Sequence, residues 1–314
     1  MEKARFKWVL RERNRKIAAK TEVFTEQQAR RVRSFHSSFK EYSPTPLIEL
    51  TSLAQHLGIK NLFVKDESYR FGLNAFKVLG GSFAIGSYIA NELGEDIDDL
   101  PYMRLVSDEV RSLLGSKTFI TTTDGNHGRG VAWTANRLKQ QAIVYMPQGS
   151  AAERLSNIRA EGAQAEITDM NYDDTVRYTS ELAQKNGWII VQDTAWDGYT
   201  RIPLWIMQGY MTMALEAYEQ LPVKPTHIFL QAGVGSLAGS VQGFFADIYG
   251  SSCPLTFIVE PKGADCLYQT AAANDGSLHS VTGRLETIMA GLACGEPNSI
   301  AWEILGNLSD GFIS

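Results

Sequence analysis

Three short stretches combine residue types whose chemistry goes beyond packing. In the first, Arg70–Ser82, Lys77 stands between Phe76 and Val78 at the expected start of a helix. The positive end of the helix dipole and the apolar neighbours both disfavour an ammonium, so we expect the pKa of Lys77 to be lowered. A partly neutral amine is what Schiff-base chemistry requires. The competing interpretation is an ordinary helical lysine that reaches to water.

The second stretch, Thr121–Gly130, follows an apolar run and precedes a helical pattern. Its three glycines would let the backbone approach a ligand closely, and the N–H groups of the new helix could receive an anion. Asp124 and Asn126 would project toward a bound small molecule, with His127 beside them. A helix N-cap explains one such residue, but it does not require three glycines and a histidine as well.

The third stretch, Gln231–Gly239, is a glycine-rich turn between an expected strand and an expected helix. Such turns form nests of backbone N–H groups that hold phosphate. Gly233, Gly235 and Ala238 also satisfy the G-x-G-x-x-[GA] dinucleotide fingerprint, and Glu260 stands near the spacing expected for a ribose-binding acid. The stretch therefore indicates a phosphate more securely than it indicates which phosphate.

Short β-rich runs alternate with helical patterns along the chain, which predicts an α/β fold with mostly parallel sheets covered by helices on both faces. Ligands in such folds lie at the carboxyl ends of strands, where the loops after the strands should be searched. The predicted strands are 61–64, 117–122, 142–146, 165–168, 188–192, 226–230 and 255–259, and the predicted helices include 130–139, 152–161, 173–185, 202–220 and 236–249.

Composition excludes several classes of protein. Hydrophobic residues make up 44% of the 314 residues and charged residues 21%, as in an ordinary globular chain. No apolar run approaches the ~18 residues of a membrane span, and no secretory signal is recognisable. The three cysteines form no disulfide framework, so Cys266 and Cys294 are expected to be free thiols, and no metal-ligand spacing occurs. We expect a cytoplasmic protein that binds neither a membrane nor nucleic acid.

The first 40 residues are basic, with 12 Lys and Arg against four Glu. Such a segment could contact nucleic acid or a membrane surface, or serve as an organelle transit peptide. Its charges are scattered and of both signs, so we expect a solvated helical arm instead.

Taken together, the three stretches resemble the fold-type II enzymes that use pyridoxal 5′-phosphate (PLP), whose two-domain fold is like that of the tryptophan synthase β chain. Members of that group have a Schiff-base lysine early in the chain, an asparagine-containing loop and a late glycine-rich phosphate loop. Here these read Asn74–Lys77, Asp124–His127 and Gly233–Gly239. A dinucleotide fingerprint would leave the first two unexplained, so the resemblance favours PLP.

A closer resemblance, to the diaminopropionate ammonia-lyases, runs from about Ser43 to the last residue. It implies α,β-elimination of D- or L-2,3-diaminopropionate to pyruvate and ammonia, in a homodimer. A shortened, catalytically weak PLP-binding paralogue and a serine or threonine dehydratase stay open as alternatives. The segments that carry this resemblance are Lys65–Lys77, Thr121–Trp133, Asp169–Thr175, Val191–Trp196, Gln231–Gly235 and Met289–Pro297.

The resemblance implies a role for each site residue. Lys77 would hold PLP as a Schiff base and Asn126 would bond its phenolic oxygen. Asp124 stands where relatives that handle serine or threonine carry a hydroxyl residue, and its carboxylate could receive the distal ammonium or take the Cα proton. Asp193 lies at the end of the predicted strand 188–192 and is a second carboxylate at the carboxyl edge of the sheet, with a helix or turn cap as the competing interpretation. The predicted catalytic residues are Lys77, Asp124 and Asp193, the cofactor-binding residues Lys77, Asn126, Gly233, Val234, Gly235, Ser236 and Leu237, and the substrate-binding residues Thr123, Asp124, Gly125 and His127.

The resemblance also divides the chain. Residues 1–82 and 201–314 are predicted to form a large PLP-binding domain, with 83–200 inserted as a smaller α/β domain. Chains of the family continue past Ser314, so we expect the stretch that completes the large domain and places a polar residue by the pyridine nitrogen to be missing.

Overall fold

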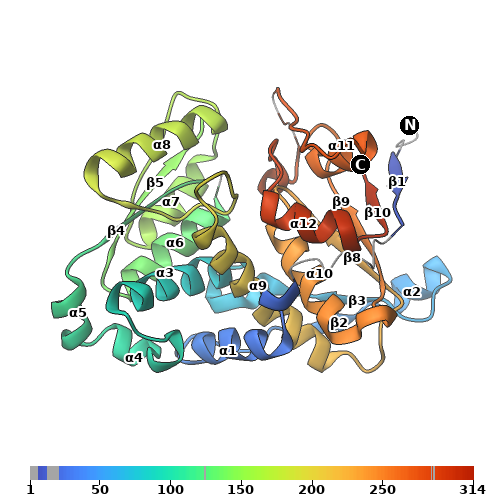
Figure 1. Ribbon diagram of the computed structural model, residues 1–314, viewed down its shortest axis with the longest axis horizontal. Coiled ribbons are helices and arrows are strands. Elements are labelled where there is room, and N and C mark those ends of the chain that lie inside the picture. The colour runs from blue at the N-terminus through green and yellow to red at the C-terminus, as the bar shows by residue number, and fades with distance from the viewer. Residues whose placement is uncertain (1–5, 13–20, 124, 284, 286) are drawn as a thin grey trace.

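Figure 1 shows the protein as a computed structural model, which describes residues 6–12, 21–123, 125–283, 285 and 287–314. Two four-stranded sheets stand apart in the view, and long helices lie between them. No helix of the described residues combines the length and the apolar character needed to cross a membrane.

The first four-stranded sheet is fully parallel, in the order β6-β5-β4-β7. Because Thr121 pairs with Val144, the two side chains share one face, and α6 packs there through Gly128. The neighbouring Thr122 points to the other face and bonds Thr179 of α8. Helices therefore cover both faces, as predicted. The elements are β4 (Thr118–Thr122), α6 (Asn126–Arg137), β5 (Gln141–Met146), α7 (Ala152–Ala160), β6 (Gln164–Ile167), α8 (Tyr172–Asn186) and β7 (Ile189–Ile190).

The second four-stranded sheet has the order β1-β10-β9-β8, with β1 antiparallel to β10 and the other pairs parallel. Ile258 and Phe312 are fully buried, whereas Trp8 and Phe229 on the opposite face are more than 60% exposed. Of its strands and helices, only the β9 and α10 ranges coincide with the expected ones. The elements are β1 (Trp8–Leu10), β8 (His227–Gln231), α10 (Ser236–Tyr249), β9 (Leu255–Val259), α11 (Cys266–Ala273), α12 (Ser299–Leu308) and β10 (Gly311–Ile313).

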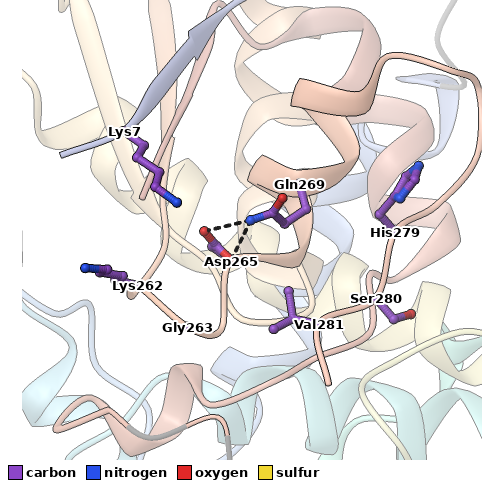
Figure 2. Close-up of a pocket in the computed structure, with 8 residues that line it drawn as sticks. All are labelled: Lys7, Lys262, Gly263, Asp265, Gln269, His279, Ser280 and Val281. Carbon is purple, nitrogen blue, oxygen red and sulfur yellow. Dashed lines mark hydrogen bonds between the residues drawn. The ribbon is translucent and has the colours of Figure 1, made fainter. Parts of the chain in front are cut away.

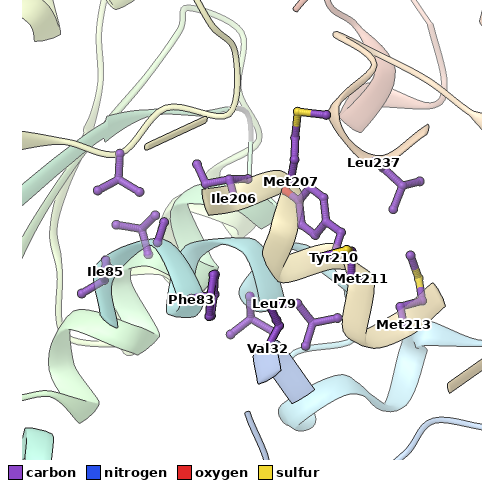
Figure 3. Close-up of a cluster of buried hydrophobic side chains, with 14 of the residues drawn as sticks. Val32, Leu79, Phe83, Ile85, Ile206, Met207, Tyr210, Met211, Met213 and Leu237 are labelled. Carbon is purple, nitrogen blue, oxygen red and sulfur yellow. The ribbon is translucent and has the colours of Figure 1, made fainter. Parts of the chain in front are cut away.

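Two helices, α3 (Lys77–Leu93) and α9 (Arg201–Gln220), cross at the centre of the molecule. Figure 3 shows buried side chains of both helices gathered in this core, among them Leu79 and Phe83 of α3 and Tyr210 of α9. Glycine permits the close crossing, because a Cβ atom on Gly209 would lie 2.4 Å from the backbone oxygen of Leu79. The crossing fixes the start of α3, where Lys77 lies.

The N-terminal elements pack on this core. Helix α1 buries Val32, Phe35 and His36, so the expected solvated arm is wrong for residues 26–37, whose apolar face contacts α9 and α3. Residues 1–5 and 13–20 lie outside the described part. The predicted strand at 61–64 is shifted to β3, which pairs antiparallel in a two-stranded sheet. The elements are α1 (Glu26–Ser37), β2 (Leu47–Glu49), α2 (Thr51–Leu57), β3 (Phe63–Lys65), α4 (Tyr102–Leu105) and α5 (Asp108–Leu114).

Candidate active site

Lys77 is the first residue of α3, as predicted, and its ammonium meets Asp193 in the segment that follows β7. The Nζ atom donates a hydrogen bond to Asp193 Oδ2 at 2.5 Å. The side chain of Lys77 is 21% exposed and that of Asp193 is 9% exposed. Two of the three predicted catalytic residues therefore lie together, although 116 positions separate them in the chain.

The pair overturns the expected lowering of the Lys77 pKa. Burial is the largest single influence and lowers this pKa, but the charge and hydrogen bond of Asp193, together with Tyr210 and Cys294, outweigh it, so the pKa is raised above its ordinary value. Burial conversely raises the pKa of Asp193, but the charge and hydrogen bond of Lys77, together with the charge of His127, outweigh burial and the pKa is lowered. Both groups are therefore ionised in the protein as described, and Lys77 is an ammonium held by a carboxylate.

Neighbouring elements hold the segment that carries Asp193. The Nε2 atom of His127 lies 2.7 Å from the carbonyl oxygen of Val191, and Gln192 bonds the backbone of Thr122 in β4. The Ser236 hydroxyl donates to the carbonyl oxygen of Asp193 at 2.6 Å. Asp193 is thus fixed between α6, β4 and the start of α10.

The glycine-rich turn after β8 opens helix α10. Gly235 is the N-cap with φ +101°, a left-handed conformation that favours glycine. The first-turn N–H groups of Ser236, Leu237 and Ala238 have no intrahelical acceptor. They offer an anion the donors and the positive end of a 14-residue helix.

Two cysteine side chains lie close to this turn at Gly233. A Cβ atom on Gly233 would lie 3.1 Å from Cys294 Sγ, and Cys266 Sγ approaches the Gly233 carbonyl oxygen at 3.7 Å. Neither cysteine is part of a disulfide in the described residues, and burial raises the pKa of Cys266. The Val234 carbonyl accepts the Asn298 N–H at 2.8 Å, which fixes the turn from α12. The predicted residues 233–237 therefore form one rigid backbone loop.

The loop between β4 and α6 holds the remaining predicted residues. Thr123 is buried, and its hydroxyl oxygen accepts the N–H of Gly125 at 3.0 Å. Asn126 begins α6 and is exposed, whereas His127 is buried beneath it. Asp124 lies outside the described residues. Helix α6 begins four positions earlier than expected, so Asn126 belongs to its first turn.

Two of the three glycines of the predicted stretch, Gly128 and Gly130, lie within α6 and permit close packing, a role not expected from the sequence. A Cβ atom on Gly128 would lie 2.3 Å from the Thr123 side chain, and one on Gly130 would lie 2.8 Å from Val78 Cα. Gly130 therefore permits the close approach of α6 to α3, and Gly128 the approach of α6 to its own sheet.

Two residues beside the site escaped the sequence analysis. Tyr210 lies within the predicted helix 202–220, and its hydroxyl is buried with no hydrogen-bond partner in the described part of the chain. Burial raises its pKa, and the charge of nearby Lys77 lowers it in part. Asn298 is fully buried and bonds Ser236. Tyr210 has the spacing of an ordinary core residue in a helix. Asn298 follows a proline-containing loop, where an asparagine indicates only a helix cap.

Glu260, the candidate ribose-binding acid, is committed to a helix start. Its carboxylate accepts the N–H groups of Leu267 and Tyr268 in α11 at 2.9 and 2.7 Å. Burial raises its pKa to about 8. The arrangement gives no support to a dinucleotide at the turn after β8.

A separate pocket of about 470 Å³ opens at the end of β9 (Figure 2). Lys7, Lys262 and His279 line it, together with Asp265, whose carboxylate accepts both of its drawn hydrogen bonds from Gln269. None of the predicted site residues contributes to this lining. In the described residues, no group of three or more His, Cys, Asp or Glu could hold a metal ion.

The chain is similar to known proteins both in sequence and in structure. The family model for "pyridoxal-phosphate dependent enzyme" matches residues 39–314. Diaminopropionate ammonia-lyase of Salmonella typhimurium is 53% identical over 287 residues, which are 90% of this chain and 71% of that protein. A crystal structure of the Escherichia coli diaminopropionate ammonia-lyase in complex with D-serine has a TM-score of 0.89 at 49% identity, covering 99% of this chain and 77% of that one.

A second crystal structure of the Escherichia coli enzyme, in complex with an aminoacrylate–PLP azomethine reaction intermediate, has a TM-score of 0.87, again at 49% identity. The match covers 99% of this chain and 76% of that one. The chain thus spans roughly three quarters of the solved structures that it matches.

Proposed function

The chain belongs to the family of pyridoxal-phosphate dependent enzymes, and we propose that it catalyses the α,β-elimination of 2,3-diaminopropionate to pyruvate and ammonia. The α/β architecture of fold type II, expected from the sequence, is confirmed by its structural neighbours. One structural observation supports the proposal most directly: a partly exposed lysine is paired with a carboxylate whose backbone is hydrogen-bonded to the glycine-rich turn.

The residues present fit PLP. Its aldehyde requires a lysine amine, which Lys77 supplies at the end of an accessible side chain. Its phosphate requires N–H donors and positive potential, which the backbone of 233–238 and the start of α10 supply. Asn126 is exposed at the start of α6 and is our candidate partner for the phenolic oxygen. When bound, PLP withdraws the electron pair left at the substrate Cα after proton removal.

Lys77 and Asp193 together determine whether the Nζ atom of Lys77 carries its third proton. The amine can attack an aldehyde only after its ammonium loses a proton, which Asp193 Oδ2, 2.5 Å away, can accept and pass on to water, so that Asp193 becomes anionic again. We propose that Lys77, once released, takes the Cα proton on one face of the substrate. The anionic Asp193 then holds the protonated Lys77 in place.

Asp124 is our candidate for the opposite face of Cα. Its neighbours Thr123 and Gly125 are buried at the carboxyl end of β4, where ligands of parallel sheets lie. A carboxylate there could take the Cα proton or receive the distal ammonium of a diamine. Thr123, Gly125 and His127 complete the candidate substrate side of the site.

Two bases on opposite faces of Cα, Lys77 and Asp124, would let one site act on both D- and L-2,3-diaminopropionate. Asp124→Asn is then expected to reduce turnover of one enantiomer of 2,3-diaminopropionate more than that of the other. Equal loss with both enantiomers would contradict the division between Lys77 and Asp124.

The test of the function itself is spectroscopic and chemical. The purified chain with PLP is expected to absorb in the visible range, to change its spectrum with diaminopropionate and to release pyruvate. Borohydride reduction followed by peptide mapping should label Lys77. Binding without turnover would indicate the catalytically weak paralogue, and faster turnover of serine or threonine would indicate a dehydratase.

The proposal also covers the division into domains, the oligomeric state and the location in the cell. The parallel sheet β6-β5-β4-β7 draws its strands from 118–190 and the other large sheet from residues outside that range, which supports the division into 1–82 with 201–314 and 83–200. We also propose a homodimer located in the cytoplasm. Sedimentation equilibrium of the purified chain tests the dimer, and cell fractionation tests the location.

A further inference from the structure

Asn298 joins helix α12 to the glycine-rich turn after β8, because its side-chain oxygen bonds the helix while its side-chain and backbone N–H groups bond the turn. Its Oδ1 atom accepts the N–H groups of Ile300 and Ala301 at 2.9 and 3.3 Å, which caps α12. Its Nδ2 atom donates to Ser236 Oγ at 2.8 Å, while its own N–H bonds Val234. The side chain is fully buried, so leaving one of these groups unpaired is costly.

The Ser236 hydroxyl has only one proton to donate, and the carbonyl oxygen of Asp193 receives it at 2.6 Å. The same oxygen accepts from Asn298. In this arrangement the hydroxyl proton is not available to a phosphate. The turn therefore offers an anion its backbone N–H groups, and the Ser236 side chain serves another purpose.

These contacts form a continuous chain from α12 to the site lysine: Asn298, Ser236, Asp193 and Lys77, with links of 2.8, 2.6 and 2.5 Å. The middle link joins α10, which follows a strand of one large sheet, to the segment after β7 of the other. We propose that Ser236 and Asn298 are positioning residues that hold Asp193 against Lys77. The inference rests on the proposed function only in taking Lys77 as the cofactor lysine.

The proposal predicts what happens when the chain of contacts is cut. Without the Ser236 hydroxyl, the Asp193 backbone loses the bond that fixes it from α10, and its carboxylate no longer stays within reach of Nζ. The ammonium of Lys77 would then be partly buried without its partner, a situation that favours the neutral amine. A neutral amine reacts faster with acylating reagents, which makes the effect measurable.

Two substitutions cut the chain at different points. Ser236→Ala removes the hydroxyl. Asn298→Asp keeps the cap of α12, because aspartate caps a helix as well as asparagine does, but it cannot donate to Ser236 and instead competes for its proton. Asn307→Asp is the matched control on the same helix, where the amide bonds the Glu303 carbonyl and lies outside the chain of contacts.

The experiment follows acetylation of Lys77 by acetic anhydride, in the full chain without PLP, by peptide mass spectrometry between pH 7 and 10. We expect Ser236→Ala and Asn298→Asp to be acetylated at least about threefold faster than the unsubstituted chain at pH 8, with Asn307→Asp unchanged. Asp193→Asn sets the upper limit of the effect. Circular dichroism checks that each variant is folded, and if Ser236→Ala is not, Asn298→Asp decides.

Unchanged acetylation of Lys77 in folded Ser236→Ala or Asn298→Asp would overturn the proposal, as would an equal increase in Asn307→Asp. The labelling uses neither PLP nor substrate, so it is independent of the proposed function. A chain that releases no pyruvate can still show the coupling, and an active enzyme can lack it.

Discussion

Two ion pairs of this molecule differ in how far their side chains are exposed to solvent. Arg70 and Glu216 are completely enclosed, with side chains 0% and 1% exposed, and their charged atoms meet at 2.7 Å. Lys77 and Asp193 are more open, at 21% and 9%, and meet at 2.5 Å. Both pairs join distant parts of the chain, since Glu216 lies on α9 and Asp193 follows β7.

The pairs differ most in how completely their hydrogen-bonding groups are used. Arg70 also bonds Glu67 and Thr45, and Glu216 also receives bonds from Tyr42 and Lys65. In the described part of the chain, Nζ of Lys77 bonds Asp193 alone. An ammonium has three donors, so the site pair keeps capacity for a ligand where the other pair has none to spare. The Arg70–Glu216 pair, whose hydrogen-bonding groups are all used, therefore stabilises the fold. The Lys77–Asp193 pair, which keeps donors unused among the described residues, is the one that can bind a ligand.

The largest expected effect is on catalysis. Lys77→Ala removes the amine that the cofactor requires, and we expect pyruvate release from diaminopropionate to fall by about 10⁴-fold or more. The control is Lys60→Ala, at an exposed position, which should leave the rate unchanged. Substantial activity in Lys77→Ala would show that the pair is structural after all.

The next effect is on stability. Glu216→Gln removes one of the two carboxylates that face the buried Arg70 guanidinium and leaves only Glu67, and we expect the free energy of unfolding to fall by about 3 kcal/mol. Urea denaturation followed by circular dichroism measures it. Glu219→Gln, on the same helix but paired with Arg30 and Arg33 at the surface, should lose less than about 1 kcal/mol. Equal losses would remove the distinction between buried and exposed pairs.

Asp193→Asn should act mainly on chemistry. We expect kcat to fall by about 10²-fold, because the proton at Nζ loses its acceptor, while the free energy of unfolding changes little. The pKa of Lys77 should also fall, since its ammonium no longer faces a carboxylate. The pH dependence of kcat/KM reports that shift, and an unchanged profile would argue against the ion pair.

The smallest effect is a pH dependence of stability. Burial raises the pKa of Glu216, but the hydrogen bonds and charges of Arg70 and Lys65 together outweigh burial and lower the pKa from 4.5 to about 2. A lowered folded pKa gives stability that is present above the unfolded value and lost as the pH falls toward 2. Urea midpoints between pH 5 and 3 should therefore decline more steeply in the unsubstituted chain than in Glu216→Gln.

Much of the fold could be predicted because local patterns report on local structure. The ranges of β9 and α10 are as expected, and Lys77 does begin a helix. Alternating apolar and polar residues, glycine turns and helix caps all act within a few positions of each other. The same locality explains the failures, because α1 was judged by its charges, although its apolar face packs against helices far along the chain.

The candidate site divides in the same way. Residue types and order along the chain were enough to single out Lys77, Asp193 and the turn at 233–239, and the family resemblance gave them roles. The expected pKa of Lys77 was wrong because its sign depends on a carboxylate 116 positions away. The glycines at 128 and 130 were misassigned because the atoms they avoid belong to other elements.

The linear order of amino acids by itself determined which chemical groups this protein possesses and which strand or helix presents each of them, since those properties arise between near neighbours. Only the tertiary structure decided which groups face one another across α3, α9 and α10, and therefore which stay charged. Electrostatic and hydrogen-bonding partners act over a few ångströms of space, whatever their separation along the chain.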